Sequence, residues 1–328
     1  MKYCFILNPA AGKGRAVSDL KQTIQSTCQE KGIQFEIYQT VGIGDASDYV
    51  KRTVALNPLE TYHFFACGGD GTLCEVVNGV MALDSRDRVA VGLIPSGTGN
   101  DFVRNFTYGE NFFDISAQIA AEEEPIDLLR CGDMYAINMI NIGFDCEVVC
   151  KTAQLKKKKW IPSKFAYVAG LICTLVRKPC MKAAISKNGQ APEKKHYLLT
   201  TYANGSFCGG GFHSNPKGSL NDKMVDTLFV ENMSRIRFLS IVKHYKNGTH
   251  LAPKFEKIIH NEKLSCLELS FDQDTNVSVD GEIITVRELR IETESQALRF
   301  LIPQGSKLIG DHYETDDLAG VASNLSAE

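Results

Sequence analysis

The stretch TYHFFACGGDGTLCEVVNGV, residues 61–80, carries the pattern that decides the fold of this chain. Thr61–Cys67 is an apolar and aromatic run that is long enough for a β-strand and too short for a helix. Apolar residues at positions 73, 76, 77 and 80 then follow at helical spacing. The loop Gly68-Gly69-Asp70-Gly71-Thr72 therefore lies where a strand ends and a helix begins. Glycines let a ligand approach the backbone there, and the free N–H groups of the first helical turn attract an anion, so the pattern predicts a phosphate-binding loop.

The stretch RVAVGLIPSGTGNDF, residues 88–102, repeats this plan. It predicts a strand at Val89–Ile94, a loop at Pro95–Gly99 and a short helix that Asn100 or Asp101 caps. Two such loops on neighbouring strands would form one cleft for a polyphosphate. The alternative is that both are ordinary strand-to-helix turns, because an isolated glycine-rich pattern is weak evidence. Two loops that each carry an acidic residue and a threonine favour the phosphate site.

The residues before this stretch predict two further strand–helix units. Tyr3–Leu7 is a strand that leads into NPAAGKG at residues 8–14, which lacks the GxxxxGK[ST] spacing of a Walker A loop. A helix is expected to follow, and Phe35–Gln39 is a second strand that ends at Thr40. Strands and helices that alternate at this spacing predict a doubly wound α/β domain with a parallel sheet. The four loops all follow the carboxyl ends of strands, where such sheets bind ligands.

The pattern changes near Pro125. Phe112–Glu123 is expected to be a helix that ends in a solvated turn at Glu122–Pro125, the candidate domain boundary. The later segments are short and alternating, and turns rich in Gly, Asn, Asp and Pro separate them, which predicts a β-sandwich. We therefore expect an α/β domain at residues 1–125 and a β-sandwich at 126–297, with residues 298–328 returning to the first domain. The strands expected after the boundary are Ile126–Leu129, Tyr135–Ile142, Tyr197–Tyr202, Val225–Val230, Cys266–Phe271, Asn276–Val279, Leu289–Glu292 and Leu298–Ile302.

Length and composition restrict the class of protein. A chain of 328 residues with 44% hydrophobic and 23% charged residues is typical of a globular protein of about two domains. The formal net charge of −3 excludes a general nucleic-acid binder, which needs a basic surface. Eleven cysteines without a CxxC pair indicate reduced thiols. We expect no signal peptide, and the longest apolar run, Phe165–Val176, is too short to span a bilayer.

GGDGT at residues 68–72 together with PSGTGNDF at residues 95–102 resembles the diacylglycerol kinase catalytic family, in its bacterial soluble lipid kinase branch. Sphingosine and ceramide kinases are relatives of this family. NAD kinases and phosphofructokinases carry loops similar to GGDGT, so PSGTGND is the more specific element. Further matches are N-P-x-x-G at 8–12, N-x-G-F-D at 141–145, asparagine–glycine at 204–205, three glycines at 209–211 and D-G-E at 280–282. The resemblance covers most of residues 1–303.

The resemblance implies an ATP-dependent kinase that phosphorylates the hydroxyl of diacylglycerol or a similar lipid in a cleft between the domains. Mg²⁺ would bridge the ATP phosphates, with Asp70 as the nearest carboxylate. Glu282 would accept the hydroxyl proton and Asp280 would support it, whereas without the resemblance the D-G-E motif is a hairpin turn. The residues expected at the nucleotide are Asn8, Pro9, Ala10, Ala11, Gly12, Thr40, Gly68, Gly69, Asp70, Gly71, Thr72 and Thr98.

The segment SLNDKMVD, residues 219–226, matches the D-G-x-L-D turn of the family, with Lys223 in place of the glycine. In the family this turn holds a structural magnesium ion, so the resemblance implies a metal site formed by the Asp222 carboxylate and the carbonyl groups of Ser219 and Met224. Oxygen ligands of this kind suit Mg²⁺. Lys223 brings a positive charge to the turn, and a plain β-turn is the alternative.

A basic cluster, Lys156–Lys159, and the adjacent Trp160 precede the apolar run Phe165–Val176. They are read either as a surface that docks on an anionic bilayer or as a solvated turn and a packed helix, and the second reading is favoured. The expected partner is a lipid substrate at the membrane surface, and the expected location is the cytoplasm with peripheral association at the inner face of the membrane.

Two other functions stay open at this point. One is a soluble small-molecule kinase similar to NAD kinase, and the other is a non-catalytic, nucleotide-responsive lipid-binding protein. The sequence leaves the lipid, the nucleotide preference and the oligomeric state undecided, a homodimer included. It does not decide between Glu282 and Asp280 as the proton acceptor.

Overall fold

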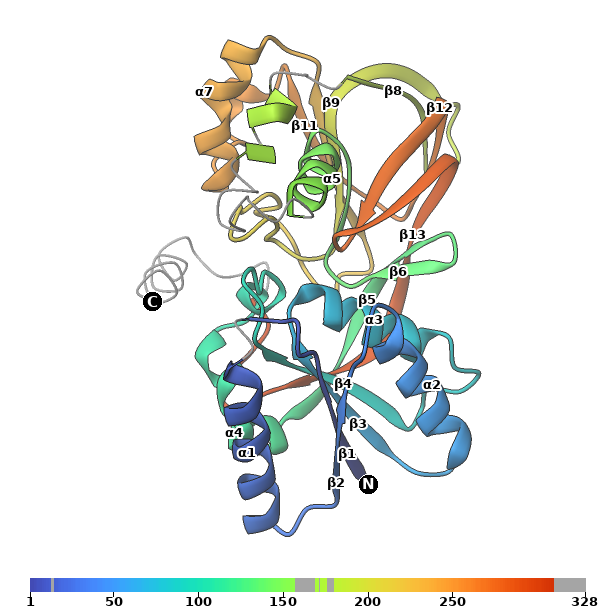
Figure 1. Cartoon of the computed structure of the whole chain (residues 1–328). Coiled ribbons are helices and arrows are strands. Elements are labelled where there is room, and N and C mark those ends of the chain that lie inside the picture. The colour runs from blue at the N-terminus through green and yellow to red at the C-terminus, as the bar shows by residue number, and fades with distance from the viewer. Residues whose placement is uncertain (13–14, 157–168, 171, 176–179, 310–328) are drawn as a thin grey trace.

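The computed structural model describes residues 1–12, 15–156, 169–170, 172–175 and 180–309. The chain forms two halves that lie one above the other in Figure 1, an α/β half below and a β-rich half above. Lys13, most of the basic cluster at 156–159, Trp160 and half of the apolar run at 165–176 lie outside the described residues. No helix within the described ranges is long and apolar enough to cross a membrane.

The lower half is built on four parallel strands in the order β4-β3-β1-β2. Alternate side chains of these strands enter two separate cores: one core contains Phe64 and packs against α2 and α3, and the other contains Phe65 and packs against α1 and α4. Helices therefore cover both faces of the sheet. The elements are β1 (Lys2–Leu7), α1 (Arg15–Glu30), β2 (Phe35–Gln39), α2 (Asp45–Leu56), β3 (Tyr62–Gly68), α3 (Asp70–Met81), β4 (Val89–Pro95) and α4 (Ile115–Ile119).

The prediction of one helix at Phe112–Glu123 is wrong. A 3₁₀ turn at Gly109–Phe113 and the short α4 replace it, and β5 (Glu122–Cys131) begins where a solvated turn was expected. The segment Glu122–Pro125 pairs with the end of β13 (Glu282–Ile302). Its acidic side chains are compatible with a strand because they are exposed, and Glu123 forms an ion pair with Arg299 and a hydrogen bond with His63 Nε2, at 3.1 Å each. The strand therefore passes through Pro125 without a break.

The upper half is antiparallel, and its helices α5 and α7 pack on one face of the sheet. Two pairs of predicted short strands each form one long strand, β12 and β13, with a register irregularity inside each. The elements are β6 (Met134–Ala136), β7 (Met139–Gly143), α5 (Phe144–Lys156), β8 (Met181–Lys187), β9 (Glu193–Ala203), β10 (Val225–Glu231), α7 (Arg235–Lys246), a 3₁₀ turn (Pro253–Phe255), β11 (Ile259–Leu264), β12 (Cys266–Val279) and β13.

Strand β13 connects the two halves. Its first part pairs with β12 in the upper half, and its last part pairs with β5 and meets β4 at the Phe300–Val91 position. The described strands consequently form one hydrogen-bonded sheet that extends through both halves. Phe300 is fully buried in the lower half, where its ring packs against those of Phe102, Phe106 and Phe112. Figure 1 shows β13 passing from the upper half into the lower one.

Candidate active site

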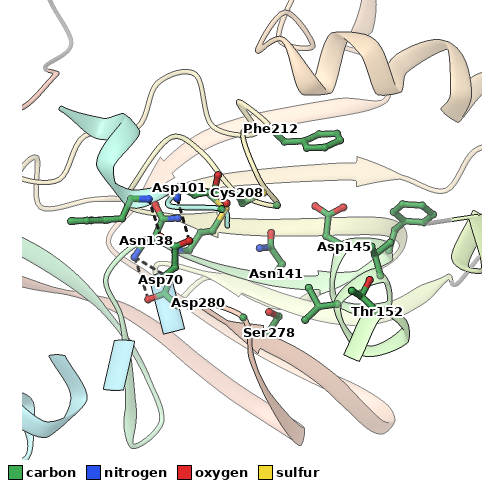
Figure 2. A pocket seen from close by; sticks show the side chains of 18 of the residues that line it. Asp70, Asp101, Asn138, Asn141, Asp145, Thr152, Cys208, Phe212, Ser278 and Asp280 are labelled. Atoms are coloured by element: carbon green, nitrogen blue, oxygen red, sulfur yellow. Dashed lines mark hydrogen bonds between the residues drawn. The ribbon is translucent and has the colours of Figure 1, made fainter. Parts of the chain in front are cut away.

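A cavity of about 480 Å³ lies between the two halves, which is a usual size for a small-molecule site. Carboxylates lie at one end, and Figure 2 shows Asp70, Asp101 and Asp280 close to one another there. The other end is mainly apolar and is formed by α5, α7 and the loop between β9 and β10. The side chains of that end include Phe144, Val148, Val149, Phe212, Phe238 and Val242.

The loops after β1, β3 and β4 touch one another at the carboxylate end. A Cβ atom on Gly97 would lie 2.5 Å from the Cα of Gly69, so these two loops meet backbone to backbone. Gly12 has a φ of +64°, and a Cβ atom there would lie 2.8 Å from the carbonyl oxygen of Ser96. Glycine is needed at these positions because no side chain fits between the loops. The two glycine-rich loops that the sequence singled out therefore form one surface together with the N-terminal loop.

Asn8 fixes the N-terminal loop to the start of α3. Its Nδ2 donates to the Thr72 hydroxyl at 2.9 Å, and its Oδ1 accepts from the Ala10 N–H at 2.9 Å. Helix α3 begins without a side-chain cap, which leaves N–H groups of its first turn facing a prospective anion. The Thr40 N–H donates to the Leu7 carbonyl at 2.9 Å, so Thr40 lies beside the same loop. The structure thus brings the expected nucleotide residues to one edge of the sheet, and Thr98 lines the cavity itself.

Asp70 holds the second loop against the first. Its Oδ2 accepts from the Asp101 N–H and its Oδ1 accepts from the Phe102 N–H, both at 3.2 Å. A Cβ atom on Gly99 would lie 3.3 Å from Asp70 Oδ2, which shows how closely this loop passes the carboxylate. Asp70 therefore faces the cavity with a fixed orientation.

Asp101 was predicted only as a helix cap, and the structure places it in the cavity wall. Its oxygens accept from the N–H groups of Gly210 at 2.8 Å and Gly211 at 2.7 Å, which belong to the upper half. Both glycines have positive φ, +83° and +100°, a conformation that glycine adopts without strain. Burial, together with the charge of Asp70, raises the pKa of Asp101. The consecutive glycines at 209–211 were the sequence signal for this contact, because they expose backbone N–H groups.

The D-G-E turn places its two acids differently. Asp280, at a φ of +47°, lines the cavity and accepts from the N–H groups of Ile137 at 2.7 Å, Asn138 at 3.1 Å and Met139 at 2.8 Å. Burial raises the pKa of Asp280 to about 7, the backbone donors partly offset this rise, and the nearby charge of Asp70 adds to it. Glu282 is exposed and does not belong to the described lining of the cavity.

The apolar end contains one further acid that sequence reasoning did not select as a site residue. Asp145 follows Phe144 at the start of α5, within the N-x-G-F-D segment. Tyr245 on α7 donates its hydroxyl to the Asp145 carboxylate at 2.8 Å, and burial raises the pKa of Asp145 to about 6. In Figure 2 Asp145 lies away from the three clustered carboxylates, nearer Phe212 and Thr152.

The carboxylate end suits a cation that comes with a polyphosphate. Asp70, Asp101 and Asp280 place negative charge where phosphate oxygens would also lie, and oxygen ligands of this kind fit Mg²⁺. No group of three or more His, Cys, Asp or Glu side chains in the described part of the chain forms a ready metal site. Asp70 remains the carboxylate that would hold the ion together with the phosphates.

The predicted structural metal turn is held by protein groups in this structure. Asp222 accepts from the Met224 N–H at 3.0 Å through Oδ1, and its Oδ2 lies 2.5 Å from the Lys263 ammonium. Lys223 has a φ of +65°, and its N–H donates to the Asp127 carboxylate at 2.6 Å. The Lys263 ammonium therefore already pairs with Asp222, which is the only side-chain ligand of the predicted magnesium site. The donor set does not fit the ion while this pair is formed. The site at Ser219, Asp222 and Met224 stays a prediction.

Comparison with known proteins identifies two matching domains. Residues 2–131 match the diacylglycerol kinase catalytic domain, and residues 138–302 match the YegS C-terminal NAD kinase β-sandwich-like domain. The chain is 28% identical over 307 residues to "Probable lipid kinase YegS-like" of Xanthomonas oryzae pv. oryzae (strain MAFF 311018), covering 91% of this chain and 96% of that protein. It is also 28% identical over 306 residues to the protein of the same name from Yersinia enterocolitica, covering 91% and 97%.

A solved structure of a diacylglycerol kinase from Bacillus anthracis str. Sterne has the same fold. Its TM-score is 0.65 at 19% sequence identity, and the match covers 92% of this chain and 97% of that one. The two-part architecture, with a catalytic domain and a β-rich C-terminal domain, is therefore shared.

The contact between the two glycine-rich loops predicts that Gly97→Ala lowers ATP affinity at least about tenfold, because the added methyl group separates the loops. Titration calorimetry with Mg-ATP measures this effect. Gly42→Ala is the matched control, since a Cβ atom on Gly42 meets nothing within 4 Å. Equal ATP affinity of Gly97→Ala and wild type would contradict the assignment of these loops.

The Asp222–Lys263 pair predicts that Lys263→Met lowers the free energy of unfolding by about 1–2 kcal/mol, because it leaves a partly buried carboxylate without its cation. The control is Lys195→Met, which breaks the exposed pair with Glu193 and should cost less than about 1 kcal/mol. Urea unfolding of the nucleotide-free protein measures both. The wild-type midpoint is expected to be the same in Mg²⁺ and in chelator, and a Mg²⁺-dependent rise would instead support the metal site.

Proposed function

We propose that this chain is an ATP-dependent lipid kinase. The premise is its family: the chain belongs to the bacterial diacylglycerol kinase-like family, which joins the diacylglycerol kinase catalytic domain to the YegS C-terminal domain. Its acceptor is the hydroxyl group of diacylglycerol or a similar lipid. The observation that carries the proposal is one cavity with two unlike ends, a carboxylate end beside the glycine-rich loops and an apolar end lined by α5 and α7.

ATP binds at the carboxylate end. The loops at residues 8–12 and 68–72 surround the phosphates, N–H groups at the start of α3 point toward them, and Thr98 adds a hydroxyl. Asp70 would hold the Mg²⁺ that comes with the nucleotide, and the ion would supply neutralisation of the phosphate charge. Phosphoryl transfer depends mainly on such positioning and charge neutralisation.

Asp280 is the group that we assign as proton acceptor, with Glu282 outside the cavity. The lipid hydroxyl oxygen attacks the γ-phosphorus in line, the bond from that phosphorus to ADP breaks, and the hydroxyl proton passes to the Asp280 carboxylate. Three backbone N–H groups fix the orientation of this carboxylate, and its pKa of about 7 suits a base that works near neutral pH.

The acyl chains lie at the apolar end, beside Phe144, Val148 and Phe238. A wall of this kind removes apolar surface from water and does not fit the polar half of a dinucleotide such as NAD. Because the acceptor is a membrane component, we propose that the protein works at the inner face of the membrane, from the cytoplasm.

The test of the activity is transfer of radiolabelled γ-phosphate from Mg-ATP to a panel of lipids in mixed micelles, with NAD as a water-soluble control. We expect label in an organic-phase product, whose identity names the acceptor. Label in NADP alone would make the protein a soluble kinase. Bound ATP without transfer to any acceptor would favour the non-catalytic alternative.

The different positions of the two acids predict different kinetic effects. Asp280→Asn should lower kcat on the order of a hundredfold to ten-thousandfold, because it removes the proton acceptor. Glu282→Gln, the matched control in the same turn, should stay within about threefold of wild type because its side chain is exposed. ATP affinity and the unfolding midpoint are measured for both variants to separate chemistry from folding.

The pH profile is the second readout of the same assignment. Asp280 must be ionised to accept a proton, so kcat/KM should fall as pH drops below about 7 and should level off above it. The limiting slope is about tenfold per pH unit. A loss of activity in Glu282→Gln as large as that in Asp280→Asn would reverse the assignment.

A further inference from the structure

Helix α7 forms part of the wall at the apolar end of the cavity. Phe238, Val242 and Tyr245 face the cavity from this helix, and Ile241 packs in the adjoining core. The hydrogen bond from Tyr245 to Asp145 fixes the helix to the start of α5. One face of α7 therefore packs against the cavity and the core. In Figure 1 the helix lies at the outer edge of the upper half.

The opposite face of α7 exposes large apolar side chains. Ile236 is 82% exposed and Leu239 is 56% exposed, although each would normally be found in a core. They are three residues apart, and Lys243 follows Leu239 at a spacing of four, so the three side chains share one face of the helix. Exposed aliphatic residues beside a lysine are typical of a helix that lies in the interface of a bilayer.

The charge of α7 has one sign. Its twelve residues contain no acid, and four exposed cationic side chains belong to it in a chain whose net charge is −3. These cations flank the apolar pair on both sides, as Lys and Arg do on helices that bind anionic lipid surfaces. They are Arg235, Arg237, Lys243 and Lys246.

We propose that the exposed face of α7, defined by Ile236, Leu239, Arg237 and Lys243, docks on a bilayer that contains anionic lipids. The same helix lines the apolar end of the cavity with its other face, so a docked α7 places that end at the membrane surface from which the acceptor lipid comes. This continuity favours a lipid surface over an acidic protein partner. The inference rests on the proposed function for its biological purpose, but the docking itself is tested without any kinase activity.

The test of docking is flotation of the full-length protein with vesicles of phosphatidylcholine, with and without about 30 mol % phosphatidylglycerol. Wild type should float with the anionic vesicles, and high salt should weaken the binding. Ile236→Ser with Leu239→Ser should reduce binding at least about tenfold, because two aliphatic side chains no longer enter the bilayer. Arg237→Gln with Lys243→Gln should remove the preference for anionic vesicles.

The matched control is Leu56→Ser with Leu59→Ser, which removes two leucines of similar exposure, 78% and 80%, from the lower half. This control should bind vesicles as wild type does. Circular dichroism and the thermal midpoint of each variant confirm that the exposed substitutions leave the fold intact. Vesicle binding by the α7 variants that equals that of wild type would overturn the proposal.

Activity separates docking from chemistry. With the acceptor lipid embedded in anionic vesicles, the α7 apolar variant should lose about tenfold in rate, matching its loss of binding. With a short-chain acceptor dissolved as a monomer, it should stay within about twofold of wild type. An equal loss with both acceptors would mean that α7 acts only through the cavity, which overturns the proposal. Vesicle binding through α7 in a protein that phosphorylates no acceptor would overturn the kinase activity and leave docking supported.

Discussion

The contact between the Asp101 carboxylate and the backbone N–H groups of Gly210 and Gly211 determines how the active-site cavity is assembled. It joins the loop after β4 to the β-rich half directly beside the cavity. Asp70 in turn accepts from the Asp101 N–H, so the two glycine-rich loops and the upper half are fixed to one another through two carboxylates. Buried carboxylates are costly unless hydrogen bonds satisfy them, and here backbone donors from different segments do so. The same bonds that compensate burial therefore fix the geometry of the carboxylate end of the cavity.

This way of building the site has an electrostatic consequence. Asp70, Asp101 and Asp280 lie around the end of the cavity proposed to accept phosphate anions, and the charge of Asp70 contributes to the raised pKa values of Asp101 and Asp280. A cation beside these groups favours their ionised forms. In the proposed mechanism, binding of a metal nucleotide and ionisation of Asp280 would thus be coupled by simple charge interactions. A cation there would lower the pKa of these carboxyl groups, so that a larger fraction of them is ionised at a given pH.

Local sequence patterns were sufficient to predict the first four strands and the loops after them. The apolar strand runs, the glycines and the helical spacing all lie within short windows such as residues 61–80. The strand at Glu122–Pro125 was missed because its partner is β13, far along the chain, and that pairing outweighs the poor strand propensity of the acids. Which acid of the D-G-E turn enters the cavity depends on the positive φ of Asp280, which the motif does not reveal. The Asp222–Lys263 ion pair could not be predicted from a local pattern either, because the two residues are 41 positions apart in the sequence.

The connection between the halves limits how the cavity can open. Beyond Pro125 the chain leaves the lower half along β5, and it returns along β13, with the two strands hydrogen-bonded to each other over most of their contact. A paired ribbon resists the free rotation that a single linker allows, and Phe300 anchors its lower end in the aromatic core next to the loop that carries Asp101. The carboxylate end is therefore the rigid end of the cavity. Under the proposed function a long acyl substrate would enter from the opposite end, where α7 rather than the paired ribbon forms the wall, and this direction of entry would follow from the topology of the sheet.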